Sequence, residues 1–165
     1  MNAITIFLLF FALMLVAYIV LSIIVKAQTK KKAVHINISY DGWLNGFDPA
    51  YTVKAKSFIS TLAGVQHNSC GYVIKKGMRN GTLKKGAPLM LIPDPDNQYD
   101  STATRVCTSD GWFIGWLPNK DWSTQIFEDL MAKRKWTASV SEIRKPKSSN
   151  DFINVAVSLQ QYYKE

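Results

Sequence analysis

The chain of 165 residues contains only two cysteines and two histidines. Cys70 and Cys107 have neither the number nor the spacing of a disulfide framework or a zinc site, so we expect two reduced thiols. A metal site would need carboxylates beside His35 and His67. The acidic residues of 94–110 lack the spacing and the closing glutamate of an EF-hand. We therefore predict neither a metal ion nor a cofactor.

Several motifs of nucleotide-binding and catalytic sites are also missing. The sequence has no Gly-x-x-x-x-Gly-Lys-Ser/Thr loop, no Gly-x-Gly-x-x-Gly after a strand and no Gly-x-Ser-x-Gly elbow. These motifs cradle phosphates or expose a nucleophile. We predict that the chain is not an enzyme.

Residues 4–25 contain no charged side chain. A helix of this length rises 1.5 Å per residue and spans a hydrocarbon core of about 30 Å. We therefore predict a transmembrane helix in residues 1–25, which contacts membrane lipid through residues 4–25. A cleaved signal peptide is the alternative, since Val25 and Ala27 form a cleavage pattern. A buried core helix is disfavoured, because the run has no polar stripe.

Four lysines, Lys26 and Lys30 to Lys32, follow this run, and no charged side chain precedes it. The positive-inside rule then predicts a single-pass membrane protein whose C-terminal domain is cytoplasmic. We assign residues 26–57 to a basic juxtamembrane segment and connector. Within it, Val34, Ile36 and Ile38 alternate with polar residues, which predicts either an extra strand on the domain or a tether.

Residues 58–162 show the short alternating runs and turn signals of a small closed sheet. Strands are predicted near 58–66, 87–92, 102–108, 111–117, 136–143 and 151–160. A helix is predicted near 120–133, because Asn119 is a suitable N-cap and its apolar residues recur at helical spacing. Gly115 lies inside a strand, where a glycine indicates a bulge or a close backbone approach. The predicted fold is mainly β: a β-barrel with one α-helix, preceded by the transmembrane helix.

Two motifs in this region resemble those of the HIRAN domain. The first is an acidic loop after an apolar strand, formed by Asp94, Pro95, Asn97, Tyr99 and Asp100. The second is a Gly-x-x-Ile-Gly-aromatic-Leu-Pro motif, formed by Gly111, Ile114, Gly115, Trp116, Leu117 and Pro118. The sequence departs from the family at Gln98, where proline is usual, and at Trp116, where tyrosine or histidine is common. The resemblance covers Phe58 to about Tyr162 and implies an OB-like barrel.

HIRAN domains are associated with DNA ends, particularly a free 3′-hydroxyl, so the resemblance implies a module that binds single-stranded DNA or its 3′ end. It implies that Tyr99 stacks on the terminal base and that Asp100 accepts a hydrogen bond from the 3′-hydroxyl. The other residues expected to line the site are Gln66, His67, Asn97, Trp116 and Lys120. For Tyr99 and Asp100 the structural alternative is that they plug the barrel end and cap the loop.

A basic segment precedes the acidic loop, and no acidic residue occurs between Pro49 and Pro93. Lysine-rich segments with glycines can follow an anionic backbone, so this segment is a candidate phosphate-contacting loop. The alternative is a solvated, flexible connection. The candidate phosphate contacts are Lys75, Lys76, Arg79, Lys84 and Lys85.

A second function remains open from the sequence. At Gln66 and His67 the HIRAN family tends to carry basic and aromatic residues, and the fixed positive charge is missing here. A bilayer anchor is also an awkward location for a DNA-end reader. The alternative prediction is a membrane-tethered module that binds a protein partner and no nucleic acid.

Overall fold

The computed structural model describes residues 2–28, 33–67, 69–146 and 152–165. The chain divides into two compact units, residues 1–32 and 33–165. Lys30 to Lys32, which carry part of the topology prediction, lie outside the described residues.

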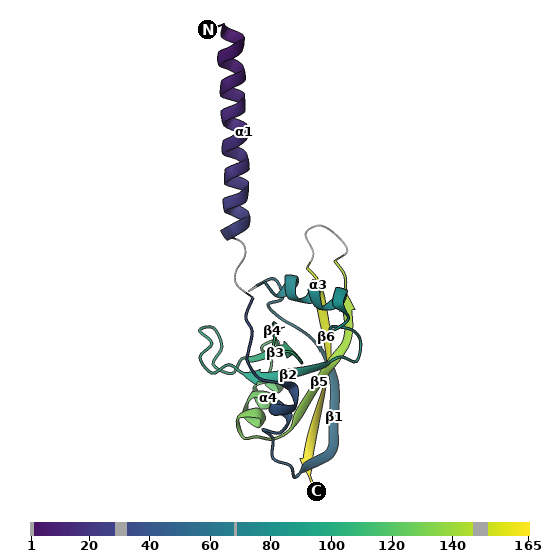
Figure 1. The fold of residues 1–165 in the computed structure, drawn as a ribbon. Coiled ribbons are helices and arrows are strands. Elements are labelled where there is room, and N and C mark those ends of the chain that lie inside the picture. Colours follow the sequence, from purple (N-terminus) through teal and green to yellow (C-terminus); the bar gives the residue numbers. More distant parts are fainter. Residues whose placement is uncertain (1, 29–32, 68, 147–151) are drawn as a thin grey trace. The chain divides into compact units, whose positions relative to one another are not determined.

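The first unit contains one long helix, α1 (Ala3–Gln28) (Figure 1). Among the residues that the structure describes, no helix is long and apolar enough to cross a membrane. The transmembrane helix expected in residues 1–25 is therefore not supported.

The second unit is built on one antiparallel sheet of six strands in the order β1-β6-β5-β2-β3-β4. The mainly β class that the sequence predicts is confirmed. The strands are β1 (Tyr51–Thr61), β2 (Pro88–Pro93), β3 (Thr104–Thr108), β4 (Phe113–Trp116), β5 (Trp136–Arg144) and β6 (Asn154–Lys164).

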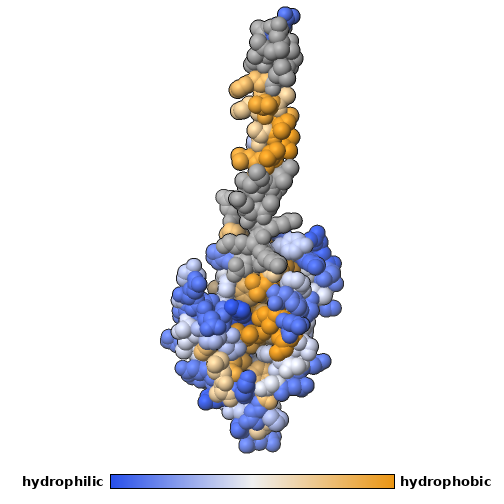
Figure 2. Space-filling model, turned by 60° about the vertical axis from the view of Figure 1, so that its left-hand side comes forward, coloured by the Kyte–Doolittle hydropathy of each residue, from blue (hydrophilic) through white to orange (hydrophobic). Residues whose placement is uncertain are grey.

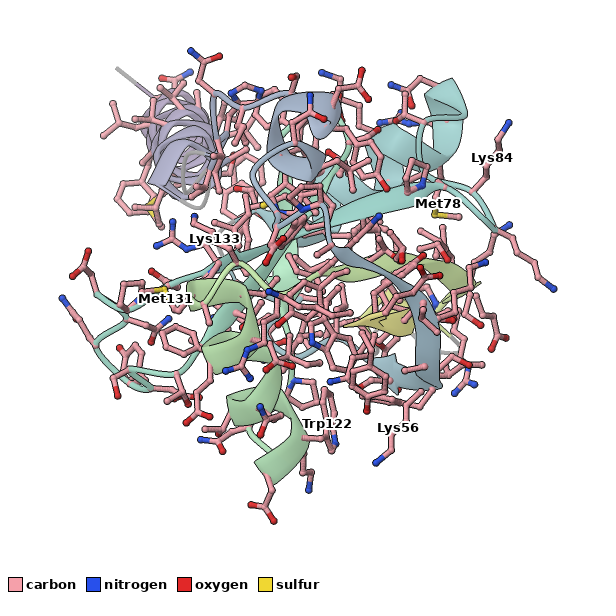
Figure 3. The ribbon with its side chains drawn as sticks, turned by 90° about the horizontal axis from the view of Figure 1, so that it is seen from below. Lys56, Met78, Lys84, Trp122, Met131 and Lys133 are labelled. Carbon is pink, nitrogen blue, oxygen red and sulfur yellow. The ribbon has the colours of Figure 1, made fainter. Side chains whose placement is uncertain are left out.

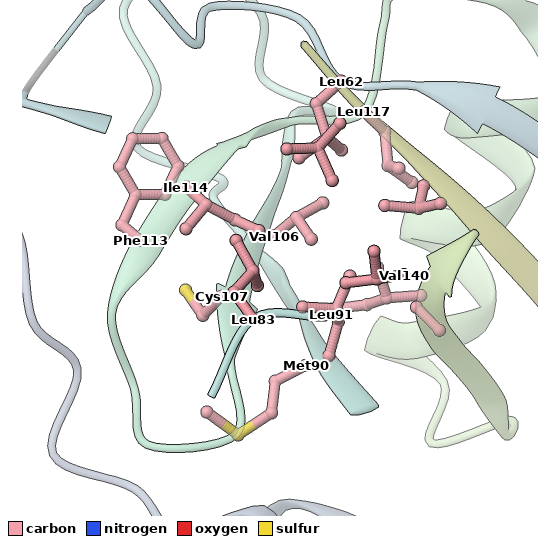
Figure 4. Packing of buried hydrophobic residues seen from close by; sticks show 14 of the residues in the cluster. Leu62, Leu83, Met90, Leu91, Val106, Cys107, Phe113, Ile114, Leu117 and Val140 are labelled. Atoms are coloured by element: carbon pink, nitrogen blue, oxygen red, sulfur yellow. The ribbon is translucent and has the colours of Figure 1, made fainter. Parts of the chain in front are cut away.

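The two edge strands of this sheet meet just beyond the end of β1. Ala63 and Trp116 form an antiparallel bridge in which each backbone N–H donates to the other residue's carbonyl, at 2.9 and 3.0 Å. The sheet therefore closes on itself at this point. Figure 4 shows the apolar side chains from β2, β3 and β4 packed together inside, among them Leu91, Val106 and Ile114, all fully buried.

Gly115 is the residue that lets the closure form. Its φ of +151° is rarely adopted by other residues, and a Cβ at this position would lie 2.8 Å from the carbonyl oxygen of Ala63. The β3–β4 pairing also shifts register beside it, between Val106 and Cys107. The predicted bulge and close backbone approach are both present.

The connector before β1 belongs to the same unit. His35 bridges to Trp112, and α2 (Tyr40–Leu44) buries Trp43, whose indole Nε1 donates to the Leu91 carbonyl at 3.1 Å. The sequence left open whether this segment lies on the domain or is a tether. It lies on the domain and contributes to its core.

Besides the short α2, two longer helices of the described residues pack on the sheet, where the sequence predicts one. α4 (Asp121–Met131) is the predicted helix, and α3 (Cys70–Asn80) replaces the predicted basic loop. The buried residues of α3 recur at helical spacing. Two of them, Cys70 and Gly77, are not the large apolar residues from which an amphipathic helix is predicted. Gly77 is required there, since a Cβ would lie 2.8 Å from the Leu83 Cβ.

The first and last strands are displaced from their predicted bounds. β1 begins seven positions before the predicted 58 and ends at Thr61, and β6 ends four positions after the predicted 160. Most side chains of β1 are at least partly exposed, because it pairs only with β6. An edge strand of this kind lacks the apolar alternation from which strands are predicted.

Candidate functional site

The loop between β2 and β3 is organised around one buried carboxylate, Asp94. The Arg105 guanidinium binds it through two contacts, Nε to Oδ2 at 2.8 Å and Nη2 to Oδ1 at 2.6 Å. The Asn97 side-chain amide donates to Oδ2 at 3.1 Å, and the Trp116 indole lies within 3.5 Å of the same oxygen. Asp94 thus connects the loop to β3 and to the end of β4.

These contacts determine the charge state of Asp94. Burial by itself would raise the pKa of its carboxyl group. The hydrogen bonds from Asn97 and Arg105, the positive charge of Arg105 and the Trp116 indole outweigh burial, and the pKa lies below its ordinary value of 3.8. Asp94 is therefore ionised at neutral pH and holds its donors by charge-assisted hydrogen bonds.

Asn97 connects Asp94 to the backbone of the residues expected to bind the DNA end. Its Oδ1 accepts hydrogen bonds from the backbone N–H groups of Tyr99 at 3.0 Å and Asp100 at 3.3 Å. The backbone under Tyr99 is therefore fixed, while the Tyr99 side chain is 96% exposed. Tyr99 does not plug the barrel end, so that structural alternative is wrong.

The two carboxylate oxygens of Asp100 differ in their contacts. Its Oδ1 accepts from the Thr102 backbone N–H at 2.9 Å and from the Thr102 hydroxyl at 2.7 Å. The predicted capping role is therefore present. No hydrogen bond to Oδ2 is found within the described part of the chain, so a hydroxyl donor from a ligand could use that oxygen.

Gln66 and His67 lie in the turn that follows the Ala63–Trp116 bridge. The His67 N–H donates to the Gly64 carbonyl at 2.9 Å, and both side chains are exposed. A Cβ on Gly64 would lie 2.5 Å from the Trp116 ring, so this turn lies directly against the indole. The structure therefore brings the segment carrying Gln66 and His67 next to Trp116.

The predicted basic contacts lie on three segments of the chain. Lys75, Lys76 and Arg79 are exposed on α3, and Lys120 is exposed before α4. Lys84 and Lys85 lie in the turn before β2. Seen from below in Figure 3, Lys84 projects from the side opposite to Met131 and Lys133 at the end of α4.

Arg105 is a residue of this site that the sequence analysis did not single out. In the β2–β3 hairpin Ile92 is directly opposite Arg105, and Asp94 lies two positions further along on the same face. Such diagonal neighbours are within reach of a long side chain. The register of the hairpin would have identified the pair, but the register follows only once the strand ends are known.

An apolar groove borders the same loop. It has a volume of about 450 Å³ and is lined by residues of the connector, α2, β2, the loop and α4. Figure 2 shows a hydrophobic area on this face of the second unit. The apolar lining residues are Ile36, Ile38, Trp43, Phe47, Leu91, Ile92, Pro93, Pro95, Leu130 and Met131.

The two cysteine thiols lie in the interior of the domain. Cys70 and Cys107 are buried, and burial raises the pKa of each to about 12. Such thiols carry almost no thiolate at neutral pH. Within the described ranges, no group of three or more His, Cys, Asp or Glu side chains could hold a metal ion.

The second unit thus combines a small closed sheet with a hydrogen-bonded loop that carries an exposed aromatic side chain. The HIRAN domain family model matches residues 56–161. Since this match covers more than half of the 165 residues, the chain belongs to the HIRAN domain family.

A solved HIRAN domain has a similar fold. The crystal structure of the HIRAN domain of human HLTF has a TM-score of 0.53 and 18% sequence identity, over 72% of this chain and 84% of that chain. A structural-genomics protein from Lactobacillus plantarum has a TM-score of 0.45 and 16% identity, over 66% of this chain and 95% of that chain. A search of curated proteins finds no match.

Proposed function

We propose that residues 33–165 bind single-stranded DNA and recognise its 3′ end through the loop between β2 and β3. The family supports nucleic-acid binding in general. The observation that carries the finer proposal is Tyr99, which is 96% exposed on a backbone fixed by Asn97. An aromatic ring held on a rigid support can stack on a base without first becoming ordered.

In this proposal Asp100 distinguishes a free 3′-hydroxyl from a phosphorylated end. An ionised carboxylate can only accept hydrogen bonds, and a hydroxyl donates one. A terminal phosphate offers negative charge instead and is repelled. The Oδ1 contacts with Thr102 hold the carboxylate in place for this role.

Trp116 and the turn of Gln66 and His67 form the neighbouring wall of the proposed site. The Trp116 indole is held by Asp94 on one side and by Gly64 on the other. Lys120 follows Trp116 by four residues and is exposed, so it can approach a phosphate. The exposed amide of Gln66 and imidazole of His67 add hydrogen-bonding groups.

We further propose that the domain is a binding module without catalysis of its own. The carboxylates of Asp94 and Asp100 make structural hydrogen bonds, and both thiols are buried. A search for release of nucleotides from labelled single strands tests this part. Release that is lost in Tyr99→Ala would contradict it.

The binding proposal is tested by titrating a short single strand with the protein at several salt concentrations. Phosphate contacts release counterions, so affinity should fall as salt rises. Tyr99→Ala should weaken binding at every salt concentration, because stacking does not depend on counterions. A salt slope near zero, or no binding at low salt, would contradict DNA recognition.

A protein partner is the second candidate, and the apolar groove favours it. Met131 is 54% exposed and Ile38 is 39% exposed at this groove. Large exposed apolar areas are typical of protein interaction surfaces. If the groove serves this purpose, Met131→Glu should abolish partner binding and leave single-strand binding unchanged.

A membrane location is proposed on the sequence alone. Residues 4–25 are uncharged and lysines follow them, which favours a single pass with a cytoplasmic C-terminal domain. Cell fractionation of the full chain, with a reporter after Glu165, tests this proposal. A chain found only in the soluble fraction would contradict the anchor, and reporter activity limited to the periplasm would contradict the orientation.

A further inference from the structure

A second cavity lies between α3 and the turn that joins β3 to β4, and the proposed function gives it no role. Its volume is about 120 Å³. This is smaller than pockets for drug-sized ligands, which measure about 300 to 1,000 Å³, so it suits one planar ring system. Its side-chain lining includes Tyr72, Lys76, Asn80, Thr108, Asp110 and Trp112.

The Trp112 indole in this cavity is held in place by the domain. Trp112 forms a β-bridge with His35, and the two rings make an edge contact with centroids 4.6 Å apart. The Lys76 ammonium lies 5.7 Å from the indole centroid. Tyr72, another residue of the lining, is 60% exposed and makes no ring contact among the described residues.

The helix beside this cavity carries positive charge that the described part of the chain does not neutralise. Lys75, Lys76 and Arg79 are exposed on α3, and none of them forms an ion pair with a described residue. The cavity's carboxylate, Asp110, accepts a hydrogen bond from the Thr108 hydroxyl at 2.5 Å on the strand side. The α3 side of the cavity is therefore the side that attracts an anion.

Two aromatic rings beside uncompensated cations match the chemistry of a nucleotide, which combines a planar base with a phosphate. We propose that this cavity is a second nucleotide pocket for the bound single strand. Its base stacks against Trp112 and Tyr72, and Lys75, Lys76 and Arg79 hold its phosphates. The base can displace the Lys76 ammonium from the face of the Trp112 indole, because an exposed cation–π contact is weak. This inference rests on the proposed function, since it extends the same strand beyond Tyr99.

The proposed pocket lies at the opposite end of β4 from the DNA-end site. Trp112 precedes β4 and Trp116 ends it, so their Cα atoms are about 13 Å apart along the extended protein backbone. A DNA strand whose 3′ end stacks on Tyr99 must therefore be longer than a dinucleotide to reach α3. Oligonucleotide length thus separates the two sites.

The experiment measures binding of the full chain to single strands of about 2 and about 12 nucleotides, the latter within the usual OB-fold range. Tyr72→Ala and Lys76→Gln should each weaken binding of the longer strand, Tyr72→Ala by about tenfold. Each should weaken binding of the dinucleotide less, because a dinucleotide cannot occupy both sites at once. Tyr163→Ala on β6 is the matched control, because Tyr163 is also exposed, at 46%, and lines a different pocket.

The outcomes separate the two proposals. If Tyr72→Ala and Lys76→Gln bind the longer strand as Tyr163→Ala does, while Tyr99→Ala still weakens it, the second pocket is wrong and the end site stands. If the wild-type chain binds neither strand, the proposed function fails, and the second pocket fails with it. Unchanged melting temperatures in Tyr72→Ala and Lys76→Gln confirm that the loss of affinity is local.

Discussion

The β2–β3 loop and α3 both border β4, but they use charge in opposite ways. In the loop, one buried carboxylate is matched by Arg105 and Asn97, and the result is a rigid backbone under an exposed tyrosine. On α3, three cations are exposed and no described acid pairs with them. Charge that is paired within the domain fixes the backbone under an exposed side chain, whereas charge that no described residue pairs with remains open to an anion.

The closure of the sheet supports both regions, and its loss should have the largest effect. Gly115→Val would place a Cβ against the Ala63 carbonyl in a backbone conformation rarely open to other residues. We expect the free energy of unfolding to fall by about 3 kcal/mol. Gly81→Ala is the control, because Gly81 has a φ of +77° but open space around its Cβ, and it should cost about 1 kcal/mol. Equal losses in chemical denaturation would contradict the closure.

Removing the charge of Asp94 should convert the rigid loop into a loose one. Asp94→Asn leaves Arg105 without its counter-charge, and we expect a loss of about 2 kcal/mol. The folded pKa of Asp94 is lowered, so its stabilisation is present above the unfolded value of 3.8 and is lost as pH falls through the folded value.

Chemical denaturation at neutral pH and at about pH 2 measures this effect. The difference in unfolding free energy between wild type and Asp94→Asn should be large at neutral pH and small in acid. The same difference at both pH values would mean that the Asp94 carboxylate does not hold the loop by its charge.

Tyr99→Ala tests the loop without disturbing it. The side chain is almost fully exposed, so stability should change by less than about 0.5 kcal/mol. Single-strand affinity should fall by about 1 to 3 kcal/mol if a base stacks on the ring. Unchanged affinity would remove the loop from the binding site, even if the protein still binds DNA.

The smallest effect concerns the basic turn after α3. Lys84→Gln should lower the slope of log affinity against log salt by about 1 if Lys84 contacts a phosphate. Lys56→Gln is the control, since Lys56 is exposed on β1 and lies far from Lys84 in Figure 3. Equal slopes for the two variants would exclude Lys84 from the DNA path.

The sequence predicts best where an element is strongly buried or alternates between buried and exposed positions. β2 to β4 are short, largely buried runs, β5 alternates, and the apolar residues of α4 recur at helical spacing, so all five elements lie within a few positions of their predicted bounds. α3 was missed because Cys70 and Gly77 occupy its buried face. The exposed edge strand β1 was misplaced, since little of it is buried.

The loop motif of the candidate site could be predicted from the sequence, but the hydrogen bonds that join its residues could not. Asn97, Tyr99, Asp100 and Trp116 are joined by one chain of hydrogen bonds through Asp94. Arg105 completes that chain from the neighbouring strand. A resemblance names the loop residues, but only the strand register shows which residue on β3 holds the loop.

The most direct test of the end-recognition proposal compares single strands with a free 3′-hydroxyl and with a 3′-phosphate. The wild-type protein should bind the hydroxyl end more tightly. Asp100→Asn keeps an Oδ1 acceptor for Thr102 but removes the negative charge. It should therefore bind the hydroxyl end less tightly and the phosphate end as well or better, at an unchanged melting temperature. Equal affinity of the wild-type protein for the two ends would contradict recognition of the 3′ end by Asp100.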